Sequence, residues 1–286
     1  MLRAFRLFAG LVLALLAGSP AVRACGLAQW TSVTASNPGV SLTASEPDGT
    51  VSRYAGRCAM VARSPANYVT DSSPRSEPAF RARFYVMSKR LAANSVPTGN
   101  SVVFQARSAD GADMITVRFN NSGADGKFEF ATSGGVFSSS AVVALDRWYA
   151  VELNWAAGAA MTATVQGAGG AALVPVATAT SAASDRIDSV SVGWISGGSN
   201  AAIVLVDAYE SRRATQIGRV CRGDADGSNV RDAADQSSIA NEFLGVGLAP
   251  LQPDCNEDGQ VDAADAICAR NLAAAGSNCN ATSTQW

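Results

Sequence analysis

Two acidic stretches near the end of this 286-residue chain have the residue types and spacing of a cation site. Each runs for twelve residues, 224–235 (loop 1) and 254–265 (loop 2), with oxygen-bearing side chains at its positions 1, 3, 5, 9 and 12. Calcium takes six to eight oxygen ligands from carboxylates, amides and backbone carbonyls, so the spacing predicts one calcium ion in each loop. The expected ligands are Asp224, Asp226, Ser228, Val230, Asp232 and Asp235 in loop 1, and Asp254, Asn256, Asp258, Gln260, Asp262 and Asp265 in loop 2.

The two loops differ at the position that makes the sharp turn. Position 6 is Gly259 in loop 2, and glycine reaches positive φ without a steric clash. In loop 1 this position is Asn229, one of the few other residues that tolerate that conformation. Loop 1 also has Ser228 at position 5 and Arg231 at position 8, where an aliphatic residue is usual. We expect loop 2 to bind calcium more strongly; the alternative for either loop is an acidic, solvated turn without metal.

The paired loops, each ending in aspartate and followed by a short helical pattern, resemble the type I dockerin module of bacterial polysaccharide-degrading systems over residues 220–276. Neither loop follows an entering helix in that family, and here Gly223 and Pro253 precede the loops. The resemblance implies a cohesin-like partner, recognised by the two residues before the last ligand and by a basic pair. The corresponding residues are Ala233, Ala234, Ala263 and Ala264, with Arg270 and Asn271 at the basic pair. A stand-alone calcium-stabilised module is the alternative.

The first 24 residues have the pattern of a secretory signal peptide. Arg3 and Arg6 precede an apolar run at residues 7–16, and small residues lead to a cleavage position before Cys25. The run is too short to span a bilayer, and no other apolar stretch approaches the length of a membrane-spanning helix. We expect a protein that is secreted or held at the cell surface. Acylation of Cys25, as in a lipoprotein, is an alternative to its pairing with Cys58.

Six cysteines in an exported chain predict three disulfides. Cys25 and Cys58 lie in the first part of the chain and are expected to pair. The other four cysteines lie in or beside the two loops and allow three pairings. The favoured pairs are Cys255 with Cys268 and Cys221 with Cys279. Zinc is a poor alternative because the chain has no histidine and no CxxC spacing.

The chain contains no histidine. Ser-His-Asp and Cys-His catalysis and histidine-ligated catalytic metals are therefore excluded, and an enzyme would have to use carboxylates, tyrosine, arginine or lysine. The formal net charge is −2, but residues 221–286 hold ten acids against three arginines, which the two loops explain. Basic residues elsewhere are scattered, so we expect no nucleic-acid partner.

Residues 26–215 alternate between apolar and polar side chains, as half-buried strands do. The clearest runs are residues 80–86, 114–119, 127–130 and 148–155, and further candidates are 102–106, 161–165, 172–177, 187–194 and 202–206. Clusters of Gly, Asn, Asp and Ser separate them. About a dozen short strands in this length predict a two-sheet β-sandwich.

The order of these segments resembles the concanavalin A-like jelly roll, of the laminin-G-like kind, over most of residues 28–213. A Phe-rich strand near Phe80, residues 146–153 and the closing residues 202–210 carry the resemblance. That fold implies carbohydrate binding often and glycan cleavage sometimes. The expected fold class is thus mainly β: a jelly-roll sandwich followed by a small α-helical dockerin-like domain with two calcium loops.

No set of catalytic residues stands out in the sandwich, and we predict none. The carboxylates that jelly-roll glycosidases place at alternate positions of one strand are absent. Glu129 and Glu152 each lie singly in a strand, where the polar face of the strand is the simpler interpretation. A sugar site would need exposed aromatic side chains, but Trp148, Trp155 and Trp194 fall at core positions.

We therefore expect a signal peptide at residues 1–24, a concanavalin A-like domain at 25–215, a dockerin-like calcium-binding domain at 216–279 and a tail at 280–286. The expected function is calcium binding with non-catalytic recognition of an extracellular polysaccharide, or surface assembly. The first alternative is a polysaccharide-degrading enzyme, a glycoside hydrolase or a lyase. The second is an adhesion or matrix protein that binds another protein. The expected partner is an extracellular glycan or a surface protein.

Overall fold

The computed structural model describes residues 25–37, 41–45, 51–92, 98–122, 125–167, 175–199, 201–276 and 278–279. The expected signal peptide at residues 1–24 and the tail at 280–286 lie outside these residues. In the described parts of the chain, no helix has the length and apolar character needed to cross a membrane.

Fourteen strands and two helices make up the described chain. The strands are β1 (Ser32–Thr34), β2 (Leu42–Ser45), β3 (Ala59–Ala62), β4 (Asn67–Asp71), β5 (Ala79–Arg90), β6 (Thr98–Arg107), β7 (Asp113–Ser122), β8 (Asp125–Thr132), β9 (Ser138–Ala144), β10 (Tyr149–Ala156), β11 (Ala160–Gln166), β12 (Val176–Thr180), β13 (Ser189–Ser196) and β14 (Ala202–Arg212). The helices are α1 (Ala233–Phe243) and α2 (Ala263–Ala275).

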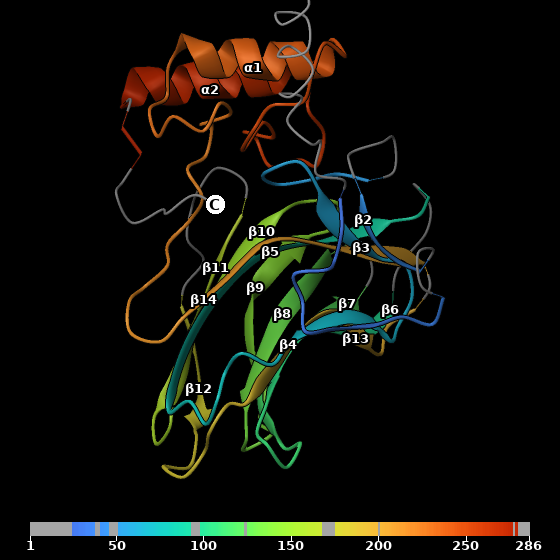
Figure 1. Ribbon diagram of the computed structural model, residues 1–286, viewed down its shortest axis with the longest axis vertical. Coiled ribbons are helices and arrows are strands. Elements are labelled where there is room, and N and C mark those ends of the chain that lie inside the picture. Colours follow the sequence, from blue (N-terminus) through green and yellow to red (C-terminus); the bar gives the residue numbers. More distant parts are fainter. Residues whose placement is uncertain are drawn as a thin grey trace, which may run out of the picture.

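The strands form two antiparallel sheets of seven strands each, which pack face to face as a jelly-roll sandwich (Figure 1). Sheet A has the order β1-β4-β13-β6-β7-β8-β9, and sheet B has the order β12-β11-β10-β5-β14-β3-β2. Helices α1 and α2 follow the last strand and lie together beyond one end of the sandwich, above β5 and β10 in Figure 1. The predicted fold class, mainly β with a small helical unit after the sandwich, is confirmed.

The space between the sheets holds the first hydrophobic core. Alternate side chains of β5, namely Phe80, Ala82, Phe84 and Val86, point into it, as the alternating pattern predicts. Trp155 and Trp194 lie in the same core and Trp148 lies in a second one, each at most 1% exposed, which confirms the core positions expected for all three.

The outer face of sheet B is apolar as well and forms the second core. Four large side chains point outward: Tyr85 and Met87 of β5, Leu205 of β14 and Trp148 beside β10. Residues 51–55, Val220 and Leu251 cover them. β5 therefore has buried side chains on both of its faces, which explains why the alternation of residues 80–84 gives way to a continuous apolar run at residues 84–87. The full set is Val51, Tyr54, Ala55, Val61, Tyr85, Met87, Trp148, Ala150, Ile203, Leu205, Val220 and Leu251.

Residues 213–222, which connect β14 to loop 1, are fastened to this outer face. The Glu152 carboxylate accepts a hydrogen bond from the Gly218 N–H at 3.3 Å, and Arg83 donates to the Gly218 carbonyl at 3.1 Å. The Val220 N–H donates to the Tyr85 hydroxyl at 2.9 Å. The connection is thus a packed segment, and the C-terminal unit (residues 216–279) is held against the sandwich.

All three predicted disulfides are present: Cys25–Cys58, Cys221–Cys279 and Cys255–Cys268. No described cysteine is free, so the Cys25 thiol is not available for acylation. Cys255–Cys268 joins loop 2 to α2, and Cys221–Cys279 joins the two ends of the C-terminal unit. The pairing favoured from the sequence is therefore confirmed.

The sequence patterns do not predict strands β1 to β4 or β9. These strands are three to seven residues long, and Ser, Thr and Ala make up much of β1, β2 and β9. Such residues give little contrast between a buried and an exposed face. The run expected at residues 172–177 corresponds to β12, which starts at Val176; residues 172–174 lie outside the described residues.

Arg83 and Glu210 form an ion pair beneath residues 213–222, with 3.2 Å between Nη2 and Oε2 and both side chains almost fully buried. We expect Arg83→Ala to lower the free energy of unfolding by about 3 kcal/mol, because the buried Glu210 carboxylate loses a counter-charge and the carbonyls of Gly218 and Ala208 lose a donor. Urea denaturation monitored by tryptophan fluorescence measures the loss.

The matched control for this prediction is Arg107→Ala, which breaks the exposed ion pair between Arg107 and Asp113. That change should alter the free energy of unfolding by less than about 1 kcal/mol. Equal losses in the two variants would contradict the role assigned to the buried pair.

Candidate functional site

Loop 1 and loop 2 have the same backbone shape, reached with different residues. Positions 4 and 6 both take positive φ: 79° at Gly227 and 66° at Asn229 in loop 1, and 62° at Glu257 and 83° at Gly259 in loop 2. In each loop one of these two positions is a glycine, which adopts the left-handed conformation easily, and the other is not. The glycine is at position 4 in loop 1 and at position 6 in loop 2. The predicted turn at position 6 is present in both loops.

Both helices start at the same place relative to their loops. Asp232 and Asp262, at position 9, are the N-caps of α1 and α2, and each accepts a hydrogen bond at 2.7 Å from the backbone two residues later. Asp235 and Asp265, at position 12, complete a capping box by accepting from the N-cap N–H at 2.8 and 2.9 Å. The capping box thus fixes the last predicted ligand of each loop in orientation.

Loop 1 gathers three carboxylates. Ligand oxygens of Asp224, Asp226 and Asp235 lie within 4.8 Å of one another. Backbone N–H groups hold them there: Asn229 donates to Asp224 at 3.0 Å, and Ala225 donates to Asp235 at 2.7 Å. Because like charges this close repel each other, a divalent cation among the three would lower the electrostatic energy of the loop.

Loop 2 holds its first and last acids in the same way. Asp254 accepts from the Gly259 and Asp258 N–H groups at 2.8 and 3.0 Å, and Asp265 accepts from the Asn256 N–H at 3.0 Å. Burial, and then the neighbouring Asp265 carboxylate, raise the pKa of Asp254 well above its usual value. Burial raises the pKa of Asp265 to about 6. Position 3 is an amide, Asn256, in loop 2 and a carboxylate, Asp226, in loop 1. Loop 2 therefore has one carboxylate fewer than loop 1 among positions 1, 3 and 12.

All twelve predicted ligands lie in the described part of the chain. The acids at positions 1 and 12 of both loops, Asp224, Asp235, Asp254 and Asp265, are fully buried. The other predicted ligands are half-buried or exposed at the loop surface: Asp226, Ser228, Val230, Asp232, Asn256, Asp258, Gln260 and Asp262. The structure therefore brings the anchoring acids of each loop together and leaves the remaining oxygens toward solvent.

Sequence reasoning missed the residue that joins loop 2 to the sandwich. The Tyr54 hydroxyl donates to the Glu257 carboxylate at 2.9 Å, and Arg219 forms an ion pair with the same carboxylate. The backbone N–H of Trp148 donates to the Glu257 carbonyl at 3.2 Å. Tyr54 in turn stacks on Tyr85, with 3.6 Å between ring centroids. Position 4 supplies no calcium ligand, and Tyr54 lies 203 residues away, so no local pattern marks the contact.

Two further contacts fasten the C-terminal unit. The Ser52 hydroxyl donates to the Gly259 carbonyl at the turn of loop 2. Arg53 is buried, pairs with Glu242 of α1, and donates to the Ala249 carbonyl at 3.0 Å. Ser52 and Arg53, in the segment before β3, therefore hold loop 2 and the end of α1 against the sandwich.

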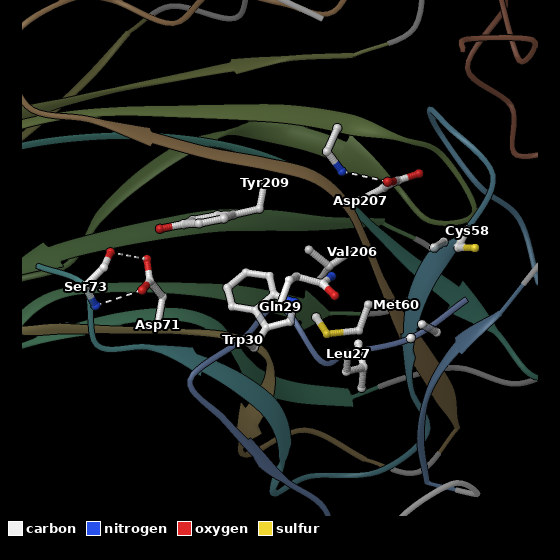
Figure 2. Close-up of a pocket in the computed structure, with 14 residues that line it drawn as sticks. Leu27, Gln29, Trp30, Cys58, Met60, Asp71, Ser73, Val206, Asp207 and Tyr209 are labelled. Atoms are coloured by element: carbon white, nitrogen blue, oxygen red, sulfur yellow. Dashed lines mark hydrogen bonds between the residues drawn. The ribbon is translucent and has the colours of Figure 1, made fainter. Parts of the chain in front are cut away.

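A pocket of about 560 Å³ lies at one edge of the sandwich. Its walls come from residues 26–30, β2, β3, the end of β4 and β14. Figure 2 shows Tyr209 along one side, with Asp71 and Ser73 at the end where the tyrosine hydroxyl lies. The rings of Trp30 and Tyr209 are 5.2 Å apart and tilted by 44°. The pocket thus combines two half-buried aromatic rings with two carboxylates, those of Asp71 and Asp207.

The outer face of sheet A is lined by polar side chains. The Glu129 carboxylate accepts from Arg118 at 2.5 Å and from Asn120 at 3.0 Å. Burial by itself would raise the pKa of Glu129, but these hydrogen bonds and the Arg118 charge outweigh it and hold the pKa below its usual value. The Arg118 guanidinium also lies 3.5 Å from the Phe137 ring centroid. Glu129 is therefore an ionised, paired carboxylate.

No protein-family model matches this chain, and no curated protein matches it. Among solved structures, an alginate lyase from Klebsiella pneumoniae is similar at a TM-score of 0.43 and 11% identity, over 55% of this chain and 82% of that one. An exolytic alginate lyase from Zobellia galactanivorans gives 0.41 and 9%, over 61% and 88%. A functionally unknown protein from Saccharomyces cerevisiae gives 0.35 and 13%, over 65% and 93%.

The raised pKa values of Asp254 and Asp265 predict how stability depends on pH when no divalent cation is bound. Unfolded carboxyls ionise near pH 4, whereas folded Asp265 keeps its proton to a pKa of about 6. The folded state thus binds more protons in this window, and stability that is fully present below about pH 4 is lost as the pH rises to about 6. We expect a loss of about 2 kcal/mol, measured by urea denaturation in chelator.

Asp265→Asn should reduce this loss, and the exposed Asp113→Asn should leave it unchanged. Added calcium should remove the part of the loss that comes from the two loops, because the cation displaces the protons there. The part from Asp207, whose pKa burial also raises to about 6, should remain. A chelated protein that becomes more stable from pH 4 to pH 6 would rule out the assignment.

Proposed function

We propose that this chain is an exported calcium-binding protein whose sandwich binds an extracellular polysaccharide without cleaving it. The convergence of Asp224, Asp226 and Asp235 within 4.8 Å is the observation that carries the calcium part. Loop 2 supports it with the same positive φ values, the same capping box and two buried acids. The three disulfides support export, because such bonds form and persist in oxidising compartments.

Calcium would act on stability more than on chemistry. The buried acids at positions 1 and 12 repel each other without a cation, so binding energy gained by the folded loops becomes folding stability. Loop 2 also contacts the sandwich through Glu257 and Gly259, so an ion in this loop would stabilise the packing of the C-terminal unit on sheet B.

Titration calorimetry should find two calcium sites in the full chain. Asp254→Ala and Asp224→Ala should each remove about one site, and chelator should lower the melting temperature of the wild type. Asp113→Ala, an exposed acid on the sandwich, should keep both sites. A melting temperature that chelator leaves unchanged would contradict the calcium proposal.

The polysaccharide part rests on surfaces of the sandwich that other described elements leave uncovered. The edge pocket offers two aromatic rings and a carboxylate, the residue types with which proteins hold sugar rings. The outer face of sheet A adds a row of polar side chains. Retention of the full chain on insoluble polysaccharides tests this part; deletion of the C-terminal unit does not, since it would expose the second core.

Cleavage of a polysaccharide is the second candidate, and it is the activity printed for two of the similar solved structures. In this chain it is favoured by the group of Arg118, Asn120 and Glu129 on the open face of sheet A. Against it stands the state of Glu129, because a general base needs a pKa near the working pH and a free lone pair. Arg118, Asn120 and Glu129 are therefore better suited to binding a polysaccharide than to cleaving it.

We expect the wild type to release no reducing ends and no unsaturated products from a panel of plant and algal polysaccharides. If turnover is found, Glu129→Gln and Arg118→Ala decide whether this group performs it, with Asp125→Asn as the control on the same sheet. Turnover that both variants abolish and the control retains would establish the second candidate in place of the first.

A protein partner remains a prediction. The positions at which the dockerin resemblance puts partner recognition, Ala233, Ala234, Ala263 and Ala264, are all exposed at the starts of α1 and α2. They are accessible to another protein and carry no polar group to select one.

A further inference from the structure

The edge pocket owes its shape to the Cys25–Cys58 disulfide. This bond joins the start of the described chain to Cys58, the residue directly before β3. Residues 26–30 therefore line the pocket together with β3 and β14. Leu27 and Trp30 then pack partly against the first core. Because these contacts fix Trp30, its ring needs little reorganisation to receive a ligand.

The polar groups of Asp71, Ser73 and Tyr209 lie together at one end of the pocket, and Asp207 lies away from them (Figure 2). The Asp71 carboxylate accepts from the Ser73 N–H at 2.8 Å and from the Ser73 hydroxyl at 3.0 Å, which leaves each oxygen with further acceptor capacity. The Tyr209 hydroxyl is buried and makes no hydrogen bond of acceptable geometry among the described residues, although Ser211 lies close to it. A buried hydroxyl without a partner is costly, and a ligand hydroxyl would remove that cost.

The charge of the lining selects among ligands. Among the described residues, the lining holds two acids, Asp71 and Asp207, and no lysine or arginine. Asp207 accepts hydrogen bonds from the backbone N–H groups of Tyr54, Ala55 and Ala208, at 2.7, 2.9 and 2.7 Å, which leaves Asp71 as the acid that meets a ligand. Arg213 acts electrostatically on Tyr209 but is paired with Glu77 at 2.9 Å. A negatively charged ligand would therefore meet the Asp71 carboxylate with no lining cation to offset the repulsion.

We infer that the edge pocket binds a sugar unit that carries no negative charge, such as a neutral hexose, a pentose or an amino sugar. This inference rests on the proposed polysaccharide binding and names its ligand class. The sugar ring lies against Trp30, its hydroxyls donate to Asp71, and one of them pairs with Tyr209. Uronic acids and sulfated sugars are rejected at this site, so the acidic polysaccharides are not its ligands.

The test uses the full chain with calcium present and a panel of short oligosaccharides. Gluco-, manno-, xylo- and chitosan oligomers represent the accepted class, and oligo-uronates represent the rejected class. Calorimetry gives affinities. Protection of tryptophan fluorescence from acrylamide, measured in the Trp286→Phe variant, reports on Trp30, because Trp148, Trp155 and Trp194 are buried. We expect one of the accepted oligomers to bind and protect, and the oligo-uronates to bind at least about tenfold more weakly.

Three variants locate the binding. Trp30→Ala should weaken the binding of the accepted oligomers by about tenfold or more, and Tyr209→Phe should weaken it severalfold. Asp71→Asn should reduce the ratio between the affinity for these oligomers and the affinity for oligo-uronates. The matched control is Tyr68→Ala, which removes a partly exposed aromatic side chain from β4 outside the pocket. The circular dichroism spectrum and melting temperature of each variant establish that it folds.

The outcomes separate this inference from the proposal beneath it. Loss of binding in Trp30→Ala but not in Tyr68→Ala supports both. Glycan binding that Tyr68→Ala abolishes and Trp30→Ala retains, or a preference for oligo-uronates at the pocket, overturns the inference and keeps the polysaccharide proposal. Binding of no oligosaccharide and no insoluble polysaccharide overturns both.

Discussion

Sheet B has apolar side chains on both of its faces, and the arrangement of the rest of the protein follows from the need to bury the outer one. Tyr85, Met87, Leu205 and Trp148 would otherwise form an exposed patch on the strands. Each large side chain of this kind contributes roughly 1.5–3 kcal/mol when buried. Residues 51–55 supply the cover together with Val220 and Leu251 of the C-terminal unit, so this unit helps to bury the outer face of the sheet that precedes it.

The two loops show how this cover shapes a local structure. Loop 1 sets its turns with Gly227 and Asn229, two residues that tolerate positive φ by themselves. Loop 2 places Glu257 at the equivalent of Gly227, where a residue with a β-carbon pays about 1 kcal/mol or more. Hydrogen bonds from Tyr54, Arg219 and the Trp148 backbone hold Glu257 there. The turn of loop 1 is thus encoded locally, and that of loop 2 depends on the sandwich.

The features that the sequence predicts are those that a short window contains. Alternation along β5, β7, β8 and β10 marks strands, and the repeated spacing of acids marks both loops with their capping helices. The four cysteines in or beside the loops allow three pairings, and the pairing found is the one that the sequence favours. An alternating pattern predicts that one face of a strand is buried, but it does not identify the residues that cover that face. The contact of Tyr54 with Glu257 is therefore not predicted by any local pattern. The edge pocket is equally invisible, since Trp30, Asp71 and Tyr209 come from three separate parts of the chain.

The double role of the C-terminal unit limits how it could be exchanged between proteins. A module that is shuffled as an independent piece needs a polar surface all around, because its new neighbour has no matching apolar face. Here Val220 and Leu251 lie in the second core, and Glu257 is buried against Tyr54. Transferred to another host, the unit would take these side chains into water, and the sandwich left behind would lose its cover. The two parts are therefore suited to being inherited together, as one cooperative unit.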